Sequence, residues 1–288
     1  MSVRQEIKQQ KNANKASLKY FHYFEDHRRR QTDFILANNP HGGRICILGA
    51  GNCFDVDLTR LCEAFTEVHL VDIDRDALDG AKKRLNVSQA KKVFLHAAVD
   101  ISGANKILED WRDLKVTPEA LLEFPALASR EITARLPADF DCVVSSCVIS
   151  QILFTCTRVL GEQHPLLQAC LITLLVTHLR LLTALTKPSG RALWITDVTS
   201  QELAPLQRQI TSDEDGAAWL HALAASNRIF TFLDPELIAD LAQQDPHIAS
   251  AAAIAGPLKI WLWQNGPQRK FLVYALIFAR RNGHDDSA

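Results

Sequence analysis

Short, largely apolar runs alternate with helical stretches along most of this chain, and this alternation restricts the fold more than any other feature. Five such runs occupy residues 44–48, 67–71, 92–97, 139–145 and 191–196. Apolar runs of this length suit strands that are buried on both faces. Repeated strand–helix units form a mostly parallel sheet with helices on both sides. The chain is therefore expected to be an α/β protein with a doubly wound sheet.

The end of the chain departs from this alternation. Two further predicted strands, residues 258–263 and 271–279, are joined by a short loop. A parallel crossover needs about a dozen residues or more, so closely joined strands must pair antiparallel. The full prediction is a seven-stranded, mostly parallel sheet with a C-terminal antiparallel strand pair.

The residues before the first strand form a predicted N-terminal helical cap. Residues 1–15 are polar and rich in Lys and Gln, and we expect them to be mobile or to act as a lid. Residues 16–38 carry aromatic side chains at helical spacing, and a cluster of helix-breaking residues at 38–43 follows them. We therefore divide the chain into a cap or lid, residues 1–40, and an α/β domain, residues 41–288.

Composition limits the partners and the location of the protein. The net charge of −1 does not suit a protein that covers a polyanion, so no nucleic-acid partner is expected. None of the seven cysteines has CxxC spacing, which predicts reduced thiols, no metal site and no disulfide framework. The apolar stretch 166–185 contains Gln168, His178 and Arg180, so we interpret it as a buried helix and not as a membrane span. The expectation is a soluble, cytoplasmic protein that makes no membrane contact.

A glycine-containing turn follows the first predicted strand. Gly49 permits a tight turn, and Gly51 allows the backbone to approach a ligand closely. Asp72 ends the second strand at a distance of 72 − 51 = 21 residues. This is close to the spacing of about 20 residues expected for an acid that binds the hydroxyls of a ribose. The alternatives are a plain strand–helix turn and a helix N-cap, and Asp74 suits the N-cap better than Asp72 does.

Other candidate residues follow the third and fourth strands. The carboxylate of Asp100 is placed to accept a hydrogen bond from an adenine amino group while Ile101 packs on the ring. The alternative is that Asp100 caps a helix expected over residues 102–111. Ser145 and Ser146 end the fourth strand, where the reactive end of a bound ligand should lie.

Taken in order, these segments resemble one enzyme family. ILGAGN, VDID, VDISG, FDCVVSSCVISQ and GRALWITD, then the Trp-rich and VYALIFARR strands, are similar to class I S-adenosylmethionine-dependent methyltransferases. The resemblance implies that residues 41–288 form a Rossmann-like methyltransferase domain that binds S-adenosylmethionine. The implied cofactor contacts are Gly49, Ala50, Gly51, Asn52 and Cys53 for the methionine part, Asp72 and Ile73 for the ribose, Asp100 and Ile101 for the adenine, and Ser145 and Ser146 beside the sulfonium and the substrate.

Three positions leave other functions open. The family often has an acid two positions before the first glycine, where this chain has Ile47, and the third glycine of its GxGxG pattern is replaced by Cys53. Both departures favour the alternative of a non-catalytic cofactor-binding or assembly protein with the same fold. A less favoured alternative is an NAD(P)-dependent oxidoreductase, because its fingerprint requires a glycine at position 54, where this chain has Phe54.

The function expected from the resemblance is in-line methyl transfer to an oxygen or nitrogen nucleophile of a small molecule. Alignment of the reactants supplies most of the catalysis in such a transfer, so no strong catalytic motif is required, and none is present. Candidates for the substrate wall are Tyr20 and Tyr23 of the cap, Ser150 and Gln151 after the fourth strand, and Asp197 at the end of the fifth. Each of them also has a purely structural interpretation.

Overall fold

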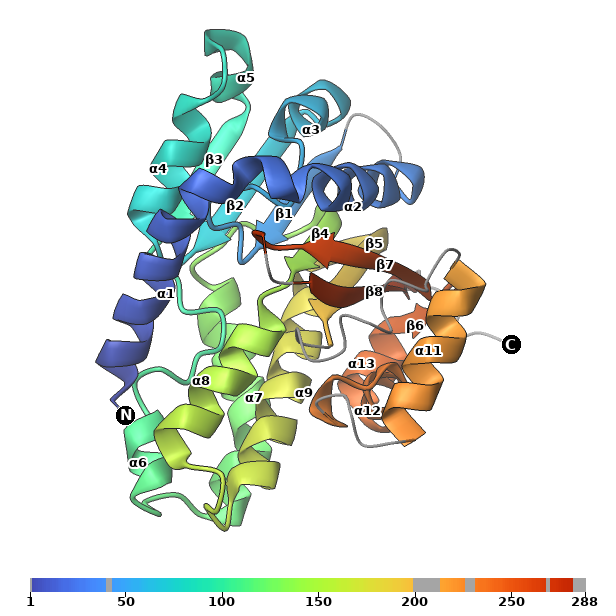
Figure 1. Cartoon of the computed structure of the whole chain (residues 1–288). Coiled ribbons are helices and arrows are strands. Elements are labelled where there is room, and N and C mark those ends of the chain that lie inside the picture. Colours follow the sequence, from blue (N-terminus) through green and yellow to red (C-terminus); the bar gives the residue numbers. More distant parts are fainter. Residues whose placement is uncertain (1, 40–42, 199–212, 226–230, 268–269, 282–288) are drawn as a thin grey trace.

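The computed structural model describes residues 2–39, 43–198, 213–225, 231–267 and 270–281. The predicted boundary between residues 40 and 41 lies outside these ranges. A single sheet runs through the centre, and helices pack on both of its faces (Figure 1). The strands are β1 (Arg44–Leu48), β2 (Glu67–Asp72), β3 (Val93–Ala97), β4 (Phe140–Ser146), β5 (Thr186–Asp197), β6 (Ala252–Ile254), β7 (Lys259–Gln264) and β8 (Lys270–Arg280).

The sheet has the order β3-β2-β1-β4-β5-β8-β6, and β7 also pairs with β8. Strands β1 to β5 are parallel, whereas β8 runs antiparallel to β5. The predicted doubly wound, mostly parallel sheet with a C-terminal antiparallel pair is thus confirmed. Its outer strand is interrupted: β6 and β7 pair with different parts of β8 and are separated at Gly256 and Pro257. With this interruption, the described part of the chain contains eight strands where we predicted seven.

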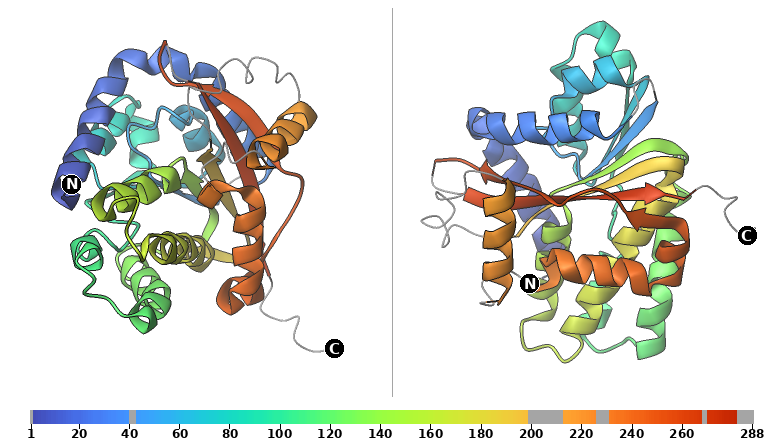
Figure 2. Two further views of the ribbon diagram at one scale, coloured as in Figure 1. Left: turned by 60° about the horizontal axis from the view of Figure 1, so that its bottom comes forward. Right: turned by 90° about the vertical axis from the view of Figure 1, so that its right-hand side faces the viewer.

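The helices form two layers that cover opposite faces of the sheet (Figure 2). Neighbouring strand residues point to opposite faces, so Ile45 and Ile47 pack in one core cluster and Cys46 and Leu48 in the other. The helices are α1 (Val3–Ser17), η1 (Leu18–Phe24), α2 (Glu25–Ala37), α3 (Leu58–Ala64), α4 (Arg75–Lys83), α5 (Val87–Lys91), α6 (Leu108–Arg112), α7 (Pro118–Thr133), α8 (Ile149–Leu160), α9 (Leu167–Leu185), α11 (Asp213–Ala225), η3 (Thr231–Leu233), α12 (Pro235–Gln244) and α13 (Pro246–Ala251).

The polar N-terminal residues are helical. The side chains of Ser2 and Gln5 form a reciprocal capping box that begins α1. Helix α1 then contacts α4 on one side and α8 on the other, and so it crosses the carboxyl edge of the sheet. The polarity of residues 1–15 reflects this position over an edge of the sheet, since few of their side chains are buried in a core.

Helix α9 is 19 residues long and, by length and composition, apolar enough to cross a membrane. Most of it is buried inside the fold, where it packs against α7, α8, β4 and β5. His178 on this helix is also buried. The arrangement is that of a core helix, as the sequence predicts.

Candidate functional site

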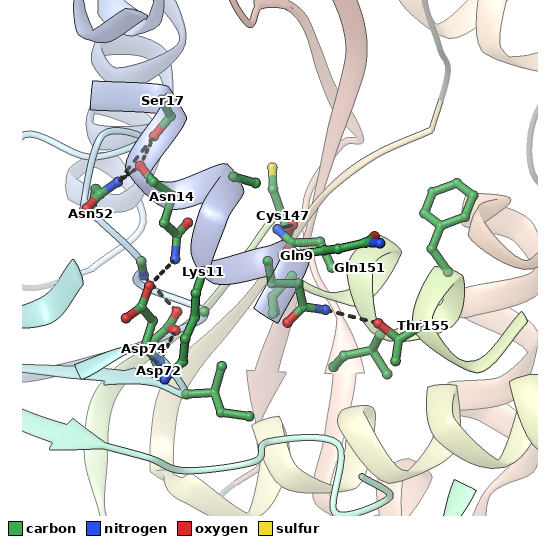
Figure 3. A pocket seen from close by; sticks show the side chains of 18 of the residues that line it. Gln9, Lys11, Asn14, Ser17, Asn52, Asp72, Asp74, Cys147, Gln151 and Thr155 are labelled. Atoms are coloured by element: carbon green, nitrogen blue, oxygen red, sulfur yellow. Dashed lines mark hydrogen bonds between the residues drawn. The ribbon is translucent and has the colours of Figure 1, made fainter. Parts of the chain in front are cut away.

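A cavity of about 910 Å³ lies at the carboxyl edge of the sheet, beneath α1. It is lined by residues that follow β1, β2, β3 and β4, together with residues of α1, η1 and α8. Figure 3 shows the side chains of α1 directed from above toward those that follow the strands. A volume of this size falls within the range of about 300–1,000 Å³ that is usual for small-molecule and cofactor sites.

The turn after β1 has the conformation that the two glycines make possible. Gly49 and Gly51 have φ values of 73° and 46°, in the left-handed region. The backbone nitrogen of Gly49 donates to the Val71 carbonyl at 3.0 Å, which ties the turn to β2. Gly49, Gly51 and Asn52 line the cavity. Two other predicted contacts, Ala50 and Cys53, are buried among the α2, α3 and α4 side chains and do not line it.

Cys53 also occupies the left-handed region, with φ of 50°. An L side chain is strained in this conformation, whereas a glycine would adopt it at no steric cost. Burial raises the pKa of the Cys53 thiol to about 12, so the thiol stays protonated. Cys53 therefore contributes packing under the turn and no nucleophile.

Asp72 links the glycine turn to the end of β2. Its Oδ2 accepts a hydrogen bond from the backbone nitrogen of Gly51 at 2.8 Å, and its Oδ1 accepts one from Asp74 at the same distance. Burial raises the pKa of this carboxyl, and backbone hydrogen bonds from Asp74, Gly51 and Ile73 oppose the shift. Asp72 and Ile73 both line the cavity. The backbone thus fixes the carboxylate in position at the cavity wall.

Asp74 does not cap α4 through its side chain, although it occupies the N-cap position. Its buried Oδ2 instead accepts a hydrogen bond from Nδ2 of Asn14 on α1, at 3.0 Å. Asp74 therefore holds the N-cap position that the sequence indicated, but its side chain makes no capping hydrogen bond. The side chain joins α1 to the end of β2, as Figure 3 shows.

Asp100 organises the loop after β3. Its Oδ1 accepts from the backbone nitrogen and hydroxyl of Ser102, at 3.0 and 2.6 Å, and its Oδ2 accepts from the nitrogen of Asn105 at 2.9 Å. These bonds hold residues 100–105 in turns, so α6 begins at Leu108 and the helix predicted over 102–111 is shorter than expected. Asp100 and Ile101 line the cavity, and their contact with an adenine stays a prediction.

The two serines at the end of β4 point to opposite faces of the sheet. Ser145 is fully buried, and its hydroxyl lies 2.7 Å from Nε2 of His178, away from the cavity. The expected position of Ser145 beside the cavity is therefore corrected, because neighbouring strand residues alternate in direction. Burial lowers the pKa of His178 to about 4, so this ring is neutral. Ser146 does line the cavity, and its hydroxyl accepts a hydrogen bond from Gln31 at 2.7 Å.

Only some of the candidates for the substrate wall line the cavity. Tyr20 and Gln151 line the cavity, whereas Tyr23, Ser150 and Asp197 do not. The Ser150 hydroxyl donates to Oδ1 of Asp197 at 2.7 Å, which joins the start of α8 to the end of β5. Tyr23 packs against Tyr20, with 6.1 Å between the ring centroids.

Helix α1 closes the cavity through polar contacts that the sequence did not indicate. The side chain of Gln10 donates to the hydroxyl of Thr155 on α8 at 3.0 Å, and Nδ2 of Asn52 donates to the carbonyl of Asn14 at 2.7 Å. Glu6 forms an ion pair with Arg158 at 3.2 Å. The only sequence feature that indicated this arrangement was the polarity of residues 1–15. Asp55 and Trp263 are two more lining residues that we did not predict.

The stability of the folded protein is expected to depend on pH through Asp197. Burial raises the pKa of its carboxyl above the usual 3.8, partly opposed by the hydrogen bond from Ser150 and the nearby His27. An acid whose pKa is higher in the folded chain costs stability once it ionises, so stability is lost as pH rises through that raised pKa. As the pH rises through this raised pKa, we expect Asp197→Asn to become more stable relative to the unchanged protein. Urea unfolding at a series of pH values measures the difference. A stability difference that stays constant with pH would contradict the expectation.

The sheet order and the position of the cavity define the fold class. Parallel strands in the order β3-β2-β1-β4-β5, followed by the antiparallel β8 and its partner β7, give the fold of class I S-adenosylmethionine-dependent methyltransferases. In the dinucleotide-binding fold, by contrast, two mostly parallel halves continue to a sixth strand. The side chain of Phe54, which lines the cavity, stands where that fold needs a glycine.

Solved structures with a similar fold include three that concern methyltransferases. A chain of the complex between the Haloferax volcanii Trm112 methyltransferase activator and a candidate methyltransferase is 12% identical, with a TM-score of 0.47 over 98% of this chain and 99% of that one. A TehB-like SAM-dependent methyltransferase from Corynebacterium glutamicum is 14% identical, with a TM-score of 0.38 and coverage of 84% and 82%. A 16S rRNA (adenine(1408)-N(1))-methyltransferase variant from Catenulisporales acidiphilia, solved with its cosubstrate SAM, is 13% identical, with a TM-score of 0.39 and coverage of 89% and 92%. No family model and no curated protein matches the chain.

Proposed function

We propose that this protein is a methyltransferase that uses S-adenosylmethionine to methylate an oxygen or nitrogen of a small molecule. One observation carries the proposal. The carboxylate of Asp72, at the end of β2, is fixed by the Gly51 backbone at the wall of a large cavity. A fixed carboxylate beside a glycine turn at the carboxyl edge suits recognition of a ribose.

The residues present fit the cofactor. A Cβ added to Gly51 would make only ordinary van der Waals contacts, at 3.6 Å to Asn14 Oδ1 and 4.0 Å to Asp72 Oδ2, so the backbone here lies at the cavity wall without crowding. In the proposal, Gly49, Gly51 and Asn52 hold the methionine part, Asp72 the ribose, and Asp100 and Ile101 the adenine. When bound, the cofactor supplies the methyl group on a sulfonium.

The contribution of the protein is to orient the reactants and to exclude water. Fixed orientation of two reactants lowers a barrier by as much as roughly 7–11 kcal/mol. Residues 1–40 act in this proposal as a lid, because α1 covers the cavity through hydrogen bonds to Thr155 and Asp74. A covered cavity and a net charge of −1 favour a small substrate over RNA or DNA. We propose the cytoplasm as its location.

Weakening the lid is expected to speed ligand exchange. The double variant Gln10→Ala/Asn14→Ala removes two side-chain hydrogen bonds of about 1 kcal/mol each. Dissociation of S-adenosylhomocysteine, followed by stopped-flow fluorescence, should therefore become at least about tenfold faster. The matched control is Lys8→Ala, an exposed position on the same helix. Equal dissociation rates in all three proteins would show that α1 does not retain the ligand.

Transfer of an isotopic label tests the activity. The protein is incubated with S-adenosylmethionine that carries a trideuterated methyl group and with a panel of phenols, carboxylic acids and amines, and products are sought by mass spectrometry. The proposal predicts a labelled small molecule that is absent with Asp72→Asn. Firm cofactor binding without any labelled product would favour the non-catalytic alternative. Labelling of RNA or of a protein alone would contradict the small-molecule substrate.

A further inference from the structure

Asp55 is a carboxylate in the cavity that none of the roles above uses. It lies just beyond the glycine turn, and its side chain is 21% exposed. Its Oδ1 is buried and has no hydrogen-bond partner among the residues that the structure describes. A carboxylate in such a position is costly to bury unless a donor or a cation reaches it. The Asp55 carboxylate therefore needs a hydrogen-bond donor or a cation beyond those that the protein provides.

His27 of α2 is the partner that the protein itself provides for Asp55. Its Nε2 lies 3.4 Å from Oδ1 of Asp55, and its Nδ1 accepts a hydrogen bond from the indole nitrogen of Trp261 at 2.8 Å. Because Nδ1 is the acceptor, a neutral His27 carries its proton on Nε2, the atom that faces Asp55. His27 is fully buried and stacks on Trp263 at 4.6 Å between ring centroids. The contact is one of ion-pair distance only, because neither Nε2 of His27 nor Oδ1 of Asp55 has a hydrogen-bond partner among the described residues, and Asp55 also lines the cavity.

The charges around Asp55 leave room for a cation. Asp197 is the second nearby acid. Arg28 is the nearby guanidinium, but it donates to the Phe54 carbonyl at 3.2 Å and lies over the Phe21 ring at 4.1 Å. Within the described part of the chain, the ion pairs recorded for Asp55 are with His27 alone. A second guanidinium, that of Arg84, donates to the Asn52 carbonyl and lies over the Phe54 ring at 4.9 Å. Within the described residues neither arginine forms an ion pair with Asp55, so the carboxylate still favours a positive ligand.

The wall beside Asp55 is aromatic. Phe24, Phe54 and Trp263 all line the cavity, and the Phe24 ring is 5.8 Å from Phe54 and 5.4 Å from Trp263. The faces of aromatic rings attract cations, and sites for organic ammonium groups commonly combine such rings with an acid. Carboxylate and aromatic wall together therefore suit an organic ammonium group better than a metal ion.

We propose that Asp55, held by His27 and flanked by Phe24, Phe54 and Trp263, binds an ammonium group in this cavity. The proposal deepens the proposed function and rests on it. Two sources can bring this chemistry: the α-ammonium of the cofactor's methionine part, or an amine on the methyl acceptor. In both cases the contact is a charge-assisted hydrogen bond from nitrogen to the carboxylate of Asp55.

The test compares the unchanged protein with Asp55→Asn, which keeps the shape of the side chain and removes its charge. Calorimetric titrations use two ligand pairs that differ in the ammonium group. S-adenosylhomocysteine is compared with methylthioadenosine, which lacks the amino-acid part, and tyramine is compared with para-ethylphenol in the presence of saturating S-adenosylhomocysteine. The control variant is Asp33→Asn, an exposed acid at the far end of α2. Unchanged binding of the two ligands without ammonium shows that Asp55→Asn is folded.

We expect Asp55→Asn to lose at least about tenfold in affinity for one ammonium ligand and to keep its affinity for the matched neutral ligand. A loss confined to S-adenosylhomocysteine assigns the site to the cofactor, and a loss confined to tyramine assigns it to the acceptor. Unchanged affinity for both ammonium ligands overturns the proposal. Failure of the unchanged protein to bind S-adenosylhomocysteine would instead contradict the proposed function, and tyramine titrated alone would still test Asp55.

Discussion

Replacing Asp72 by asparagine is expected to weaken the binding of S-adenosylhomocysteine at least about tenfold, because hydrogen bonds to a charged acceptor contribute about 1.5–3 kcal/mol. An asparagine has a single acceptor oxygen, and the Gly51 and Asp74 nitrogens both compete for it. The ribose hydroxyls then lose the carboxylate that would accept from them. Calorimetric titration measures the change, with Asp76→Asn, an exposed acid in the first turn of α4, as the matched control.

The pH dependence of binding gives this prediction a second measurement. Burial raises the pKa of Asp72 above its usual 3.8, and the ionised form is the stronger acceptor of hydrogen bonds from a ligand. The affinity of the unchanged protein should therefore fall as the pH is lowered toward the raised pKa, while Asp72→Asn should lack this component. An identical affinity and pH profile in the two proteins would show that Asp72 does not contact the ligand.

Gly49→Ala is expected to destabilise the protein by about 2–5 kcal/mol, the sum of left-handed strain and overpacking. A Cβ at Gly49 would lie 2.7 Å from Cγ2 of Val148 and closer still to its Cβ, at a φ of 73°. Urea unfolding followed by circular dichroism measures the loss.

The neighbouring glycine provides the comparison. The methyl group of Gly51→Ala would make only ordinary van der Waals contacts, the nearest at 3.6 Å, so its cost in stability should be limited to the strain, about 1–2 kcal/mol. Its added methyl group faces the cavity and should reduce cofactor affinity more than stability. Equal losses of stability in the two variants would contradict the packing described for Val148.

Local sequence patterns were sufficient to predict the architecture. Buried parallel strands form continuous apolar runs, so β1, β2, β4 and β5 were recognisable without knowledge of their partners. The Gly51–Asp72 pair was also predictable, because a strand–turn–helix unit has a nearly fixed length. The structure adds a direct hydrogen bond between the two residues.

Features that depend on contacts between distant segments were not predictable. Ser145 is equivalent to Ser146 in the sequence, and only the register of β4 against β1 and β5 turns it toward His178. The polar sequence of α1 gave no sign that Asn14 bonds to Asp74 across the cavity. Asp55 and His27 come from different segments, and their pairing depends on where α2 packs against β7. Each of these features is set by packing, which a local pattern does not encode.

The most direct test of the account is a calorimetric titration of the purified protein with S-adenosylhomocysteine and, in parallel, with NADH. The account predicts one site of micromolar affinity for S-adenosylhomocysteine and no binding of NADH. Binding of NADH alone, or of neither compound, would contradict it.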